Sequence, residues 1–191
     1  MRSRLGLRDH GSADCAALVK GLLDESDLGE GYTHMAQRPA QHDDVTVIGC
    51  PALEKLGSEA AVGGSFEFPH KAKASFTDAG GSDSLAEELY SDTGERLSEG
   101  VSRIFAALTS CPTYQVLVGA TPVTVTAQKV PVPRLGDERW SQLLSFTAGG
   151  RSQVAKQTAV RTGTVVVVLS GSSALVDAHV EKALDRVCAE R

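Results

Sequence analysis

The stretch that decides the fold reads AVRTGTVVVVL and occupies residues 159–169. Its second half, Val165 to Leu169, is an almost continuous run of β-branched residues, which is typical of a central strand covered on both faces. Gly163 supplies a turn residue, so the preceding strand, Gln153 to Arg161, is expected to pair with the valine-rich strand in a hairpin. This part of the chain therefore predicts the buried middle of a β-sheet.

Further short strands precede this hairpin at close spacing. Val123, Val125 and Ala127 alternate with polar residues, as expected of a strand with one buried face. Gly149-Gly150 is one of several turn signals that separate neighbouring strands. The other strands expected in this half are Tyr114 to Val118 and Arg139 to Ala148. Consecutive strands with short turns indicate antiparallel pairing.

The first half of the chain contributes one more pair of strands. From Ser65 to Phe76 the apolar and polar residues alternate, with Pro69 in the middle. Because proline cannot donate a ladder hydrogen bond, this pattern predicts a half-buried strand at the edge of the sheet. Gly80-Gly81 marks a turn, and Ser84 to Tyr90 is the expected returning strand, although the spacing of its leucines also fits a helix.

Helices are expected between the groups of strands. The clearest extends from Thr93 to Thr109, where apolar residues recur every three to four positions opposite charged ones. The others run from about Cys15 to Leu23, from Cys50-Pro51 to Leu56, and from Ser172 to Cys188. The order of elements predicts an α+β fold, with a single central antiparallel β-sheet, packed helices and a terminal helix at each end of the chain. We expect residues 1–13 to be a flexible N-terminal segment and residues 14–191 to form one domain.

The composition excludes two classes of partner. The formal net charge of -5 is wrong for a protein that must neutralise phosphates, so we expect no nucleic acid partner. The longest apolar runs, among them Val165 to Leu169, fall far short of the roughly 20 residues of a membrane-spanning helix. The opening MRSRLGLR carries positive charge but lacks the apolar core of a signal peptide.

Candidate catalytic and metal-binding groups are scattered. No two histidines lie three or four positions apart on one helix, so we predict no metal site and no cofactor; they are His10, His34, His42, His70 and His179. Neighbouring residues on a strand point to opposite faces, so the carboxylate pairs Glu87-Glu88 and Asp137-Glu138 are expected to be surface groups rather than catalytic pairs. The aromatic residues are expected in the core, or else around a cavity beneath the helix from Thr93 to Thr109; they are Phe66, Phe68, Phe76, Trp140 and Phe146.

Several short pieces together resemble the PknH-like extracellular sensor domains and related secreted lipoproteins of actinobacteria. The pieces are LLDESDLGEGYT (22–33), CPAL (50–53), LTSC (108–111), PRLGD (133–137) and AVRTGTVVVV (159–168). The resemblance covers most of the chain from Leu22 onward. It implies an α+β domain with a central antiparallel sheet, disulfide bridges, a location outside the cell membrane and a sensing role without catalytic residues. Members of the family often carry a cysteine shortly before the final strand, where this chain has Lys156 and Gln157.

Four cysteines lie far apart in the sequence, which favours disulfides over a zinc site. Cys50 and Cys111 lie at the start of one predicted helix and the end of another, so a bridge would join the two helices at the sheet. Cys15 and Cys188 lie on the first and last helices and would then form the second pair. Four cysteines allow three connectivities, and buried reduced thiols are the alternative.

The function expected from these features is non-enzymatic. A disulfide-bearing domain of an exported lipoprotein-type protein would bind an unknown small ligand or envelope protein, as a monomer, outside the cell or at the cell envelope. Two alternatives remain. One is a cytoplasmic enzyme or regulatory protein with reduced cysteines; the other is a carrier of a small apolar ligand held between the Thr93 to Thr109 helix and the sheet.

Overall fold

The computed structural model describes residues 15–36, 45–56 and 66–189. The predicted N-terminal segment, 1–13, lies outside these residues. The helices are α1 (Cys15–Gly21), α2 (Glu25–Leu28), α3 (Pro51–Leu56), α5 (Gly94–Ser110) and α6 (Ser173–Ala189). The strands are β1 (Tyr32–His34), β2 (Val45–Ile48), β3 (His70–Asp78), β4 (Ser84–Ser91), β5 (Thr113–Val118), β6 (Thr121–Lys129), β7 (Glu138–Ala148), β8 (Arg151–Thr162) and β9 (Val165–Gly171).

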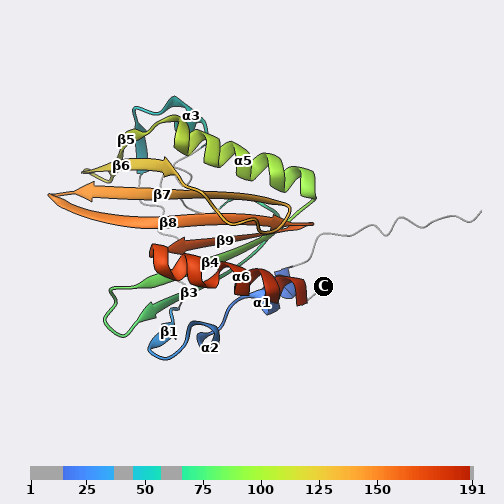
Figure 1. The fold of residues 1–191 in the computed structure, drawn as a ribbon. Coiled ribbons are helices and arrows are strands. Elements are labelled where there is room, and N and C mark those ends of the chain that lie inside the picture. The colour runs from blue at the N-terminus through green and yellow to red at the C-terminus, as the bar shows by residue number, and fades with distance from the viewer. Residues whose placement is uncertain (1–14, 37–44, 57–65, 190–191) are drawn as a thin grey trace, which may run out of the picture.

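All strands of the described residues join one nine-stranded sheet in the order β1-β3-β4-β9-β8-β7-β6-β5-β2 (Figure 1). Every neighbouring pair is antiparallel. From β5 to β9 the strands follow one another as a meander, whereas β9 also pairs with β4 from the first half of the chain. The predicted α+β fold with a single central antiparallel sheet and a helix at each end is confirmed.

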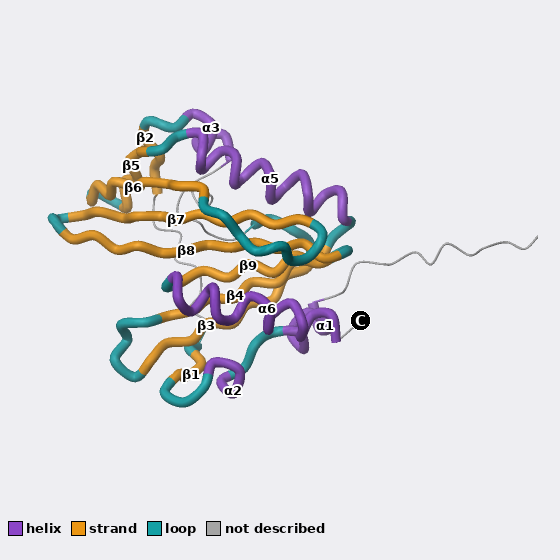
Figure 2. The backbone as a smooth tube through the Cα atoms, viewed as in Figure 1, coloured by secondary structure: helices purple, strands orange, loops and turns teal. Residues whose placement is uncertain are grey.

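The valine-rich strand β9 contributes to the core on both sides of the sheet. Val165, Val167 and Leu169 belong to one apolar cluster, together with Val176 and Val180 of α6. The alternate residues Val166 and Val168 belong to another, together with Leu97 and Val101 of α5. Because successive side chains of a strand point to opposite faces, α5 and α6 cover opposite faces of the sheet. Their arrangement along the strands is visible in Figure 2.

The side of α5 that faces the sheet is apolar and buried. Leu97, Val101, Phe105 and Leu108 of α5 are each at most 5% exposed and pack against residues of the strands. These residues therefore belong to the hydrophobic core of the domain. None of the described helices is long and apolar enough to span a membrane.

Two details of the first strand pair differ from the prediction. β3 begins at His70, one residue after Pro69, so the proline precedes the strand and does not interrupt it. β3 also lies between β1 and β4, which corrects the expected edge position: the three-residue strand β1 occupies that edge. The segment from Ser84 is a strand rather than a helix, and its residues pair with both β3 and β9.

Two short elements have no counterpart among the predicted ones. α2 forms between the first helix and β1, and β2 forms the second edge of the sheet beside β5. The first helix ends at Gly21 rather than Leu23. A Cβ atom at Gly21 would lie 3.4 Å from the side chains of Leu89 and Val187, so this glycine lets α1 approach the sheet and α6 closely.

Candidate functional site

The strongest polar cluster of the described residues forms around the loop between α1 and α2. Asp24 caps α2, and its Oδ1 atom accepts hydrogen bonds from the backbone nitrogens of Ser26 at 2.9 Å and Asp27 at 3.2 Å. The Asp27 carboxylate in turn accepts a hydrogen bond from the backbone nitrogen of Asp24 at 2.9 Å. This reciprocal capping box satisfies backbone donors at the start of the helix and orders both carboxylates.

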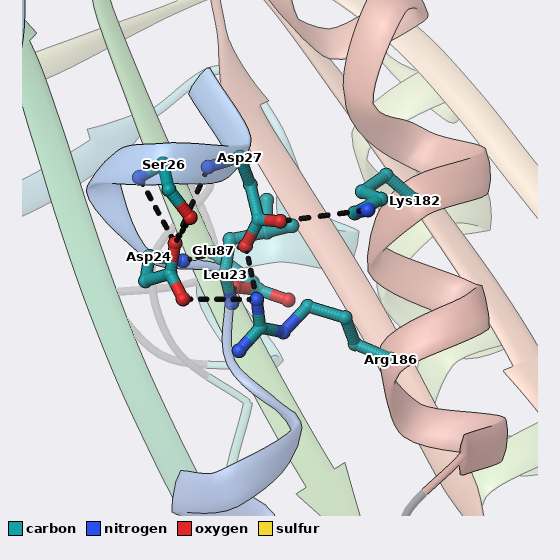
Figure 3. Close-up of polar contacts among 7 residues, drawn as sticks. All are labelled: Leu23, Asp24, Ser26, Asp27, Glu87, Lys182 and Arg186. Carbon is teal, nitrogen blue, oxygen red and sulfur yellow. Dashed lines mark hydrogen bonds and ion pairs between the residues drawn. The ribbon is translucent and has the colours of Figure 1, made fainter. Parts of the chain in front are cut away.

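Two cations from α6 reach these carboxylates (Figure 3). Arg186 Nη1 lies 3.1 Å from Asp24 Oδ2 and also contacts Asp27 Oδ2. Lys182 Nζ lies 3.7 Å from Asp27 Oδ1. Lys182 and Arg186 are four positions apart, so one face of α6 presents both. The hydrogen bond from Ser26 and the contacts of Arg186 lower the pKa of Asp24 to about 2.

Glu87 lies beneath this cluster on β4. Its side chain is 0% exposed, and Oε2 accepts a hydrogen bond from the backbone nitrogen of Leu23 at 2.7 Å. Its Oε1 atom is buried without a hydrogen-bond partner among the described residues. Burial raises the pKa of Glu87 to about 8, because the ionised carboxylate loses its hydration. At neutral pH the group is therefore mainly a protonated acid.

The neighbours of Glu87 within the sheet are apolar. It is paired with Ala74 on β3 and Leu169 on β9, both of which belong to the apolar cluster beneath α6. The polar surroundings of the carboxyl group therefore come from the α1–α2 loop and α6, not from the sheet. Glu88, the next residue, points to the opposite face, where Lys73 Nζ lies 2.8 Å from its carboxylate and Tyr90 donates a hydrogen bond to it.

A shallow hollow of about 580 Å³ opens beside the cluster. It is lined by Leu23, Asp24, Glu25, Ser26, His34 and Phe76. The backbone nitrogen of His34 donates to Glu25 Oε1 at 2.7 Å, and the His34 ring packs edge-on against Phe76 with the ring centroids 5.5 Å apart. The hollow thus combines two carboxylates with apolar and aromatic carbon.

A second hollow of about 290 Å³ lies between α6 and the turn before β7. Its lining residues are Leu135, Gly136, Thr162, Glu181, Leu184, Asp185 and Cys188. Cys188 is exposed and forms no disulfide with another described side chain. Cys15 opens α1, and its side chain lies outside the described atoms, so the expected Cys15–Cys188 pair stays a prediction.

Cys50 and Cys111 form a disulfide, with their Cα atoms 5.8 Å apart. Cys50 directly precedes α3, and Cys111 directly follows α5. The bond therefore joins the start of one helix to the end of the other beside the β2 edge of the sheet, where α3 packs on α5. Cys50 itself is fully buried in the apolar cluster with Leu53 and Leu108.

The carboxylate pairs and histidines considered in the sequence lie in different surroundings. The expectation that Glu87 and Glu88 point to opposite faces is right, but the surface role assigned to Glu87 is wrong, because α6 and the α1–α2 loop cover it. Asp137 and Glu138 both bind Arg161, at 3.5 and 2.5 Å. Of the histidines, His34 borders the larger hollow, and the described residues contain no group of three metal ligands.

Comparisons with known proteins place the fold. No family model matches the sequence, and no curated protein matches it. The crystal structure of the extracellular domain of PknH from Mycobacterium tuberculosis superposes with a TM-score of 0.71, covering 94% of this chain and 99% of that domain. The fold is PknH-like. The sequences are only 14% identical, so the likeness to the PknH domain concerns the fold.

Proposed function

We propose that this chain is a non-enzymatic, sensor-like binding domain that works outside the cytoplasm as part of an exported, lipoprotein-type protein. The observation that carries this proposal is the match of almost the whole chain to the PknH extracellular domain. The Cys50–Cys111 disulfide supports it, because disulfides persist mainly in oxidising compartments. We further propose that the domain acts as a monomer.

The hollow beside α2 is the proposed binding site for a small ligand or for a side chain of an envelope protein. Asp24 and Glu25 place negative charge at its rim, while Phe76, Leu23 and His34 offer carbon surface. This chemistry suits a ligand that carries an amine or guanidinium group next to an apolar portion. A ligand of the opposite charge would meet the carboxylate of Glu25, and the Arg186 cation is already engaged by Asp24 and Asp27.

Backbone amide chemical shifts test this site directly. Phenethylamine, an aromatic cation, is titrated into isotope-labelled protein to about 10 mM, which detects millimolar affinity. We expect saturable shifts at Ser26 and His34 and at least a five-fold weaker affinity for Glu25→Gln. Glu181→Gln, in the second hollow, is the matched control and should bind as the parent does. Shifts that spread evenly over the surface, or that are unchanged in Glu25→Gln, would contradict a cation site here.

The compartment is tested separately by peptide mapping. The protein is purified from its native host under non-reducing conditions with free thiols alkylated beforehand. Peptides that join Cys50 to Cys111 would support a location outside the cytoplasm. Four alkylated cysteines would contradict it and favour a cytoplasmic enzyme or regulatory protein.

A further inference from the structure

We propose that Glu87 and Arg186 form a pH-sensitive latch, which holds the α1–α2 segment on the sheet in acid and releases it as the pH rises. This inference goes beyond ligand binding and stands without any particular ligand. It rests on the contacts that cross between the segment and the rest of the domain.

Two residues outside the segment receive several polar contacts from the loop after α1 and the start of α2, while the backbone of His34 on β1 binds Glu25 separately. Glu87 of β4 accepts the Leu23 backbone hydrogen bond, and Arg186 of α6 contacts the carboxylates of Asp24 and Asp27. Lys182 adds a longer contact to Asp27. Below them Leu18, Leu23 and Leu28 pack into the apolar cluster beneath α6. The segment is thus held by apolar packing on one side and by polar contacts to β4 and α6.

The charges that face Glu87 come from two elements. The capped start of α2 contributes Asp24 and Asp27, and α6 contributes Lys182 and Arg186. On β4, β3 and β9 the neighbours on the same face are apolar, among them Leu85, Leu89, Ala74, Phe76 and Leu169. The two cations balance the two aspartates, so ionisation of Glu87 would add a buried negative charge without a cation of its own.

In the closed state, the α1–α2 segment is packed on the sheet as described above. The unpartnered Oε1 atom makes this state sensitive to the ionisation of Glu87. As a neutral acid, Glu87 can remain buried with one hydrogen bond to Leu23. As a carboxylate, it would either draw Arg186 away from Asp24 and Asp27 or require water at Oε1. Both responses weaken the attachment of the α1–α2 segment.

The direction follows from proton linkage. The pKa of Glu87 is about 8 in the closed protein and 4.5 in an exposed glutamate, so the closed state holds the proton between these values. Opening releases the proton, and the open fraction rises up to roughly ten-fold per pH unit within that window. Above about pH 8 both states are ionised and the effect levels off. Because Leu23, Asp24 and Ser26 also line the larger hollow, release of the latch would remove one wall of it.

Amide hydrogen exchange, corrected for intrinsic rates, measures the latch from about pH 5 to pH 8.5. We expect the amide of Leu23 to exchange through a local opening that is easier than the global unfolding reported by Val167 of β9. Its protection factor should fall at least ten-fold between about pH 6 and pH 8. In Glu87→Gln, which keeps an acceptor for Leu23 but cannot ionise, the protection factor should be independent of pH. Asp177→Asn, an exposed change on α6, is the matched control and should behave as the parent.

Three results would overturn the proposal. They are a parent protein whose Leu23 protection does not change with pH, a Glu87→Gln variant with the same dependence as the parent, and equal protection of Leu23 and Val167 at every pH. If Glu87→Gln does not fold, the carboxyl carbon shift of Glu87 in the parent gives the answer. A midpoint well above pH 6 supports the latch, and one near pH 4.5 refutes it.

Discussion

The Oε2 atom of Glu87 lies 2.7 Å from the backbone nitrogen of Leu23, 64 positions away in the sequence. This single hydrogen bond links the interior strand β4 to the loop after the first helix. Because it is made by a buried carboxyl group, it connects local structure with proton binding. The stability of the whole domain should therefore depend on the protonation of one strand residue.

Glu87→Gln should change how stability varies with pH. The folded protein holds the Glu87 proton between about pH 4.5 and pH 8, whereas the unfolded chain loses it near pH 4.5, so this group lowers stability as the pH rises through that window. The variant lacks this loss. In urea unfolding, the free energy of unfolding of Glu87→Gln relative to that of the parent should increase by more than about 1 kcal/mol between pH 5 and pH 8. A constant difference between the two proteins would contradict the raised pKa.

Removing the disulfide should destabilise the domain strongly. The bond between Cys50 and Cys111 spans a sequence separation of 61, for which loop-closure entropy gives about 4 kcal/mol. We expect the double variant Cys50→Ala, Cys111→Ala to lose roughly 3 to 4 kcal/mol in urea unfolding. Gln128→Ala, an exposed change on β6, is the control and should lose less than about 0.5 kcal/mol. Similar stabilities of the two variants would contradict a structural role for the bond.

Two glycines with the same backbone conformation should tolerate alanine differently. Gly136 has φ 59° and Gly119 has φ 61°, so alanine is strained at both positions by about 1 kcal/mol. At Gly136 the added Cβ would also lie 2.5 Å from the carbonyl oxygen of Arg161, whereas at Gly119 nothing lies within 4 Å. Gly136→Ala should therefore lose at least about 2 kcal/mol more than Gly119→Ala in thermal unfolding. Equal losses would mean that the turn before β7 moves freely away from β8.

The cap of α2 should respond to substitution and to acid. Asp24→Ala removes the acceptor for Ser26 and Asp27 and should lose about 1 kcal/mol at pH 7. Asn caps helices nearly as well, so Asp24→Asn should lose less. Because the pKa of Asp24 is lowered, its charge stabilises the fold fully above about pH 4, and this contribution is lost as the pH falls through about 2. The free energies of unfolding of Asp24→Asn and the parent, measured by chemical unfolding, should become equal at that pH. A difference in free energy that persists there would argue against a charge effect.

The sequence was sufficient for the parts of the fold that depend on local pattern. The valine run from Val165 to Leu169 predicts a strand buried on both faces. The spacing of apolar residues along α5 predicts which side of this helix packs on the sheet. β2 was missed, although Val45 to Ile48 is a short run of β-branched residues that could have indicated a strand. Its length of 4 residues makes the signal weak, and its place in the sheet depends on β5.

The candidate site could not be found from local pattern. Two consecutive glutamates do not by themselves indicate a buried carboxyl group, although Glu87 alternates with Leu85 and Leu89 along β4. Leu23 and Arg186, which act on its carboxyl group, lie far from it in the sequence. The signal that was available, a strand residue that must face the α6 side like Leu85 and Leu89, requires knowledge of which face that helix covers.

The position of β9 between β4 and β8 has a consequence for how the chain folds. The hairpin of β3 and β4 and the meander from β5 to β8 can each form from neighbouring segments, but they join only through residues 165–171. During synthesis both groups of strands emerge from the ribosome before β9 does, and each then exposes an unpaired edge strand. Folding intermediates that lack β9 should therefore be the species most exposed to aggregation, and native topology is completed only when this late strand inserts between the two groups.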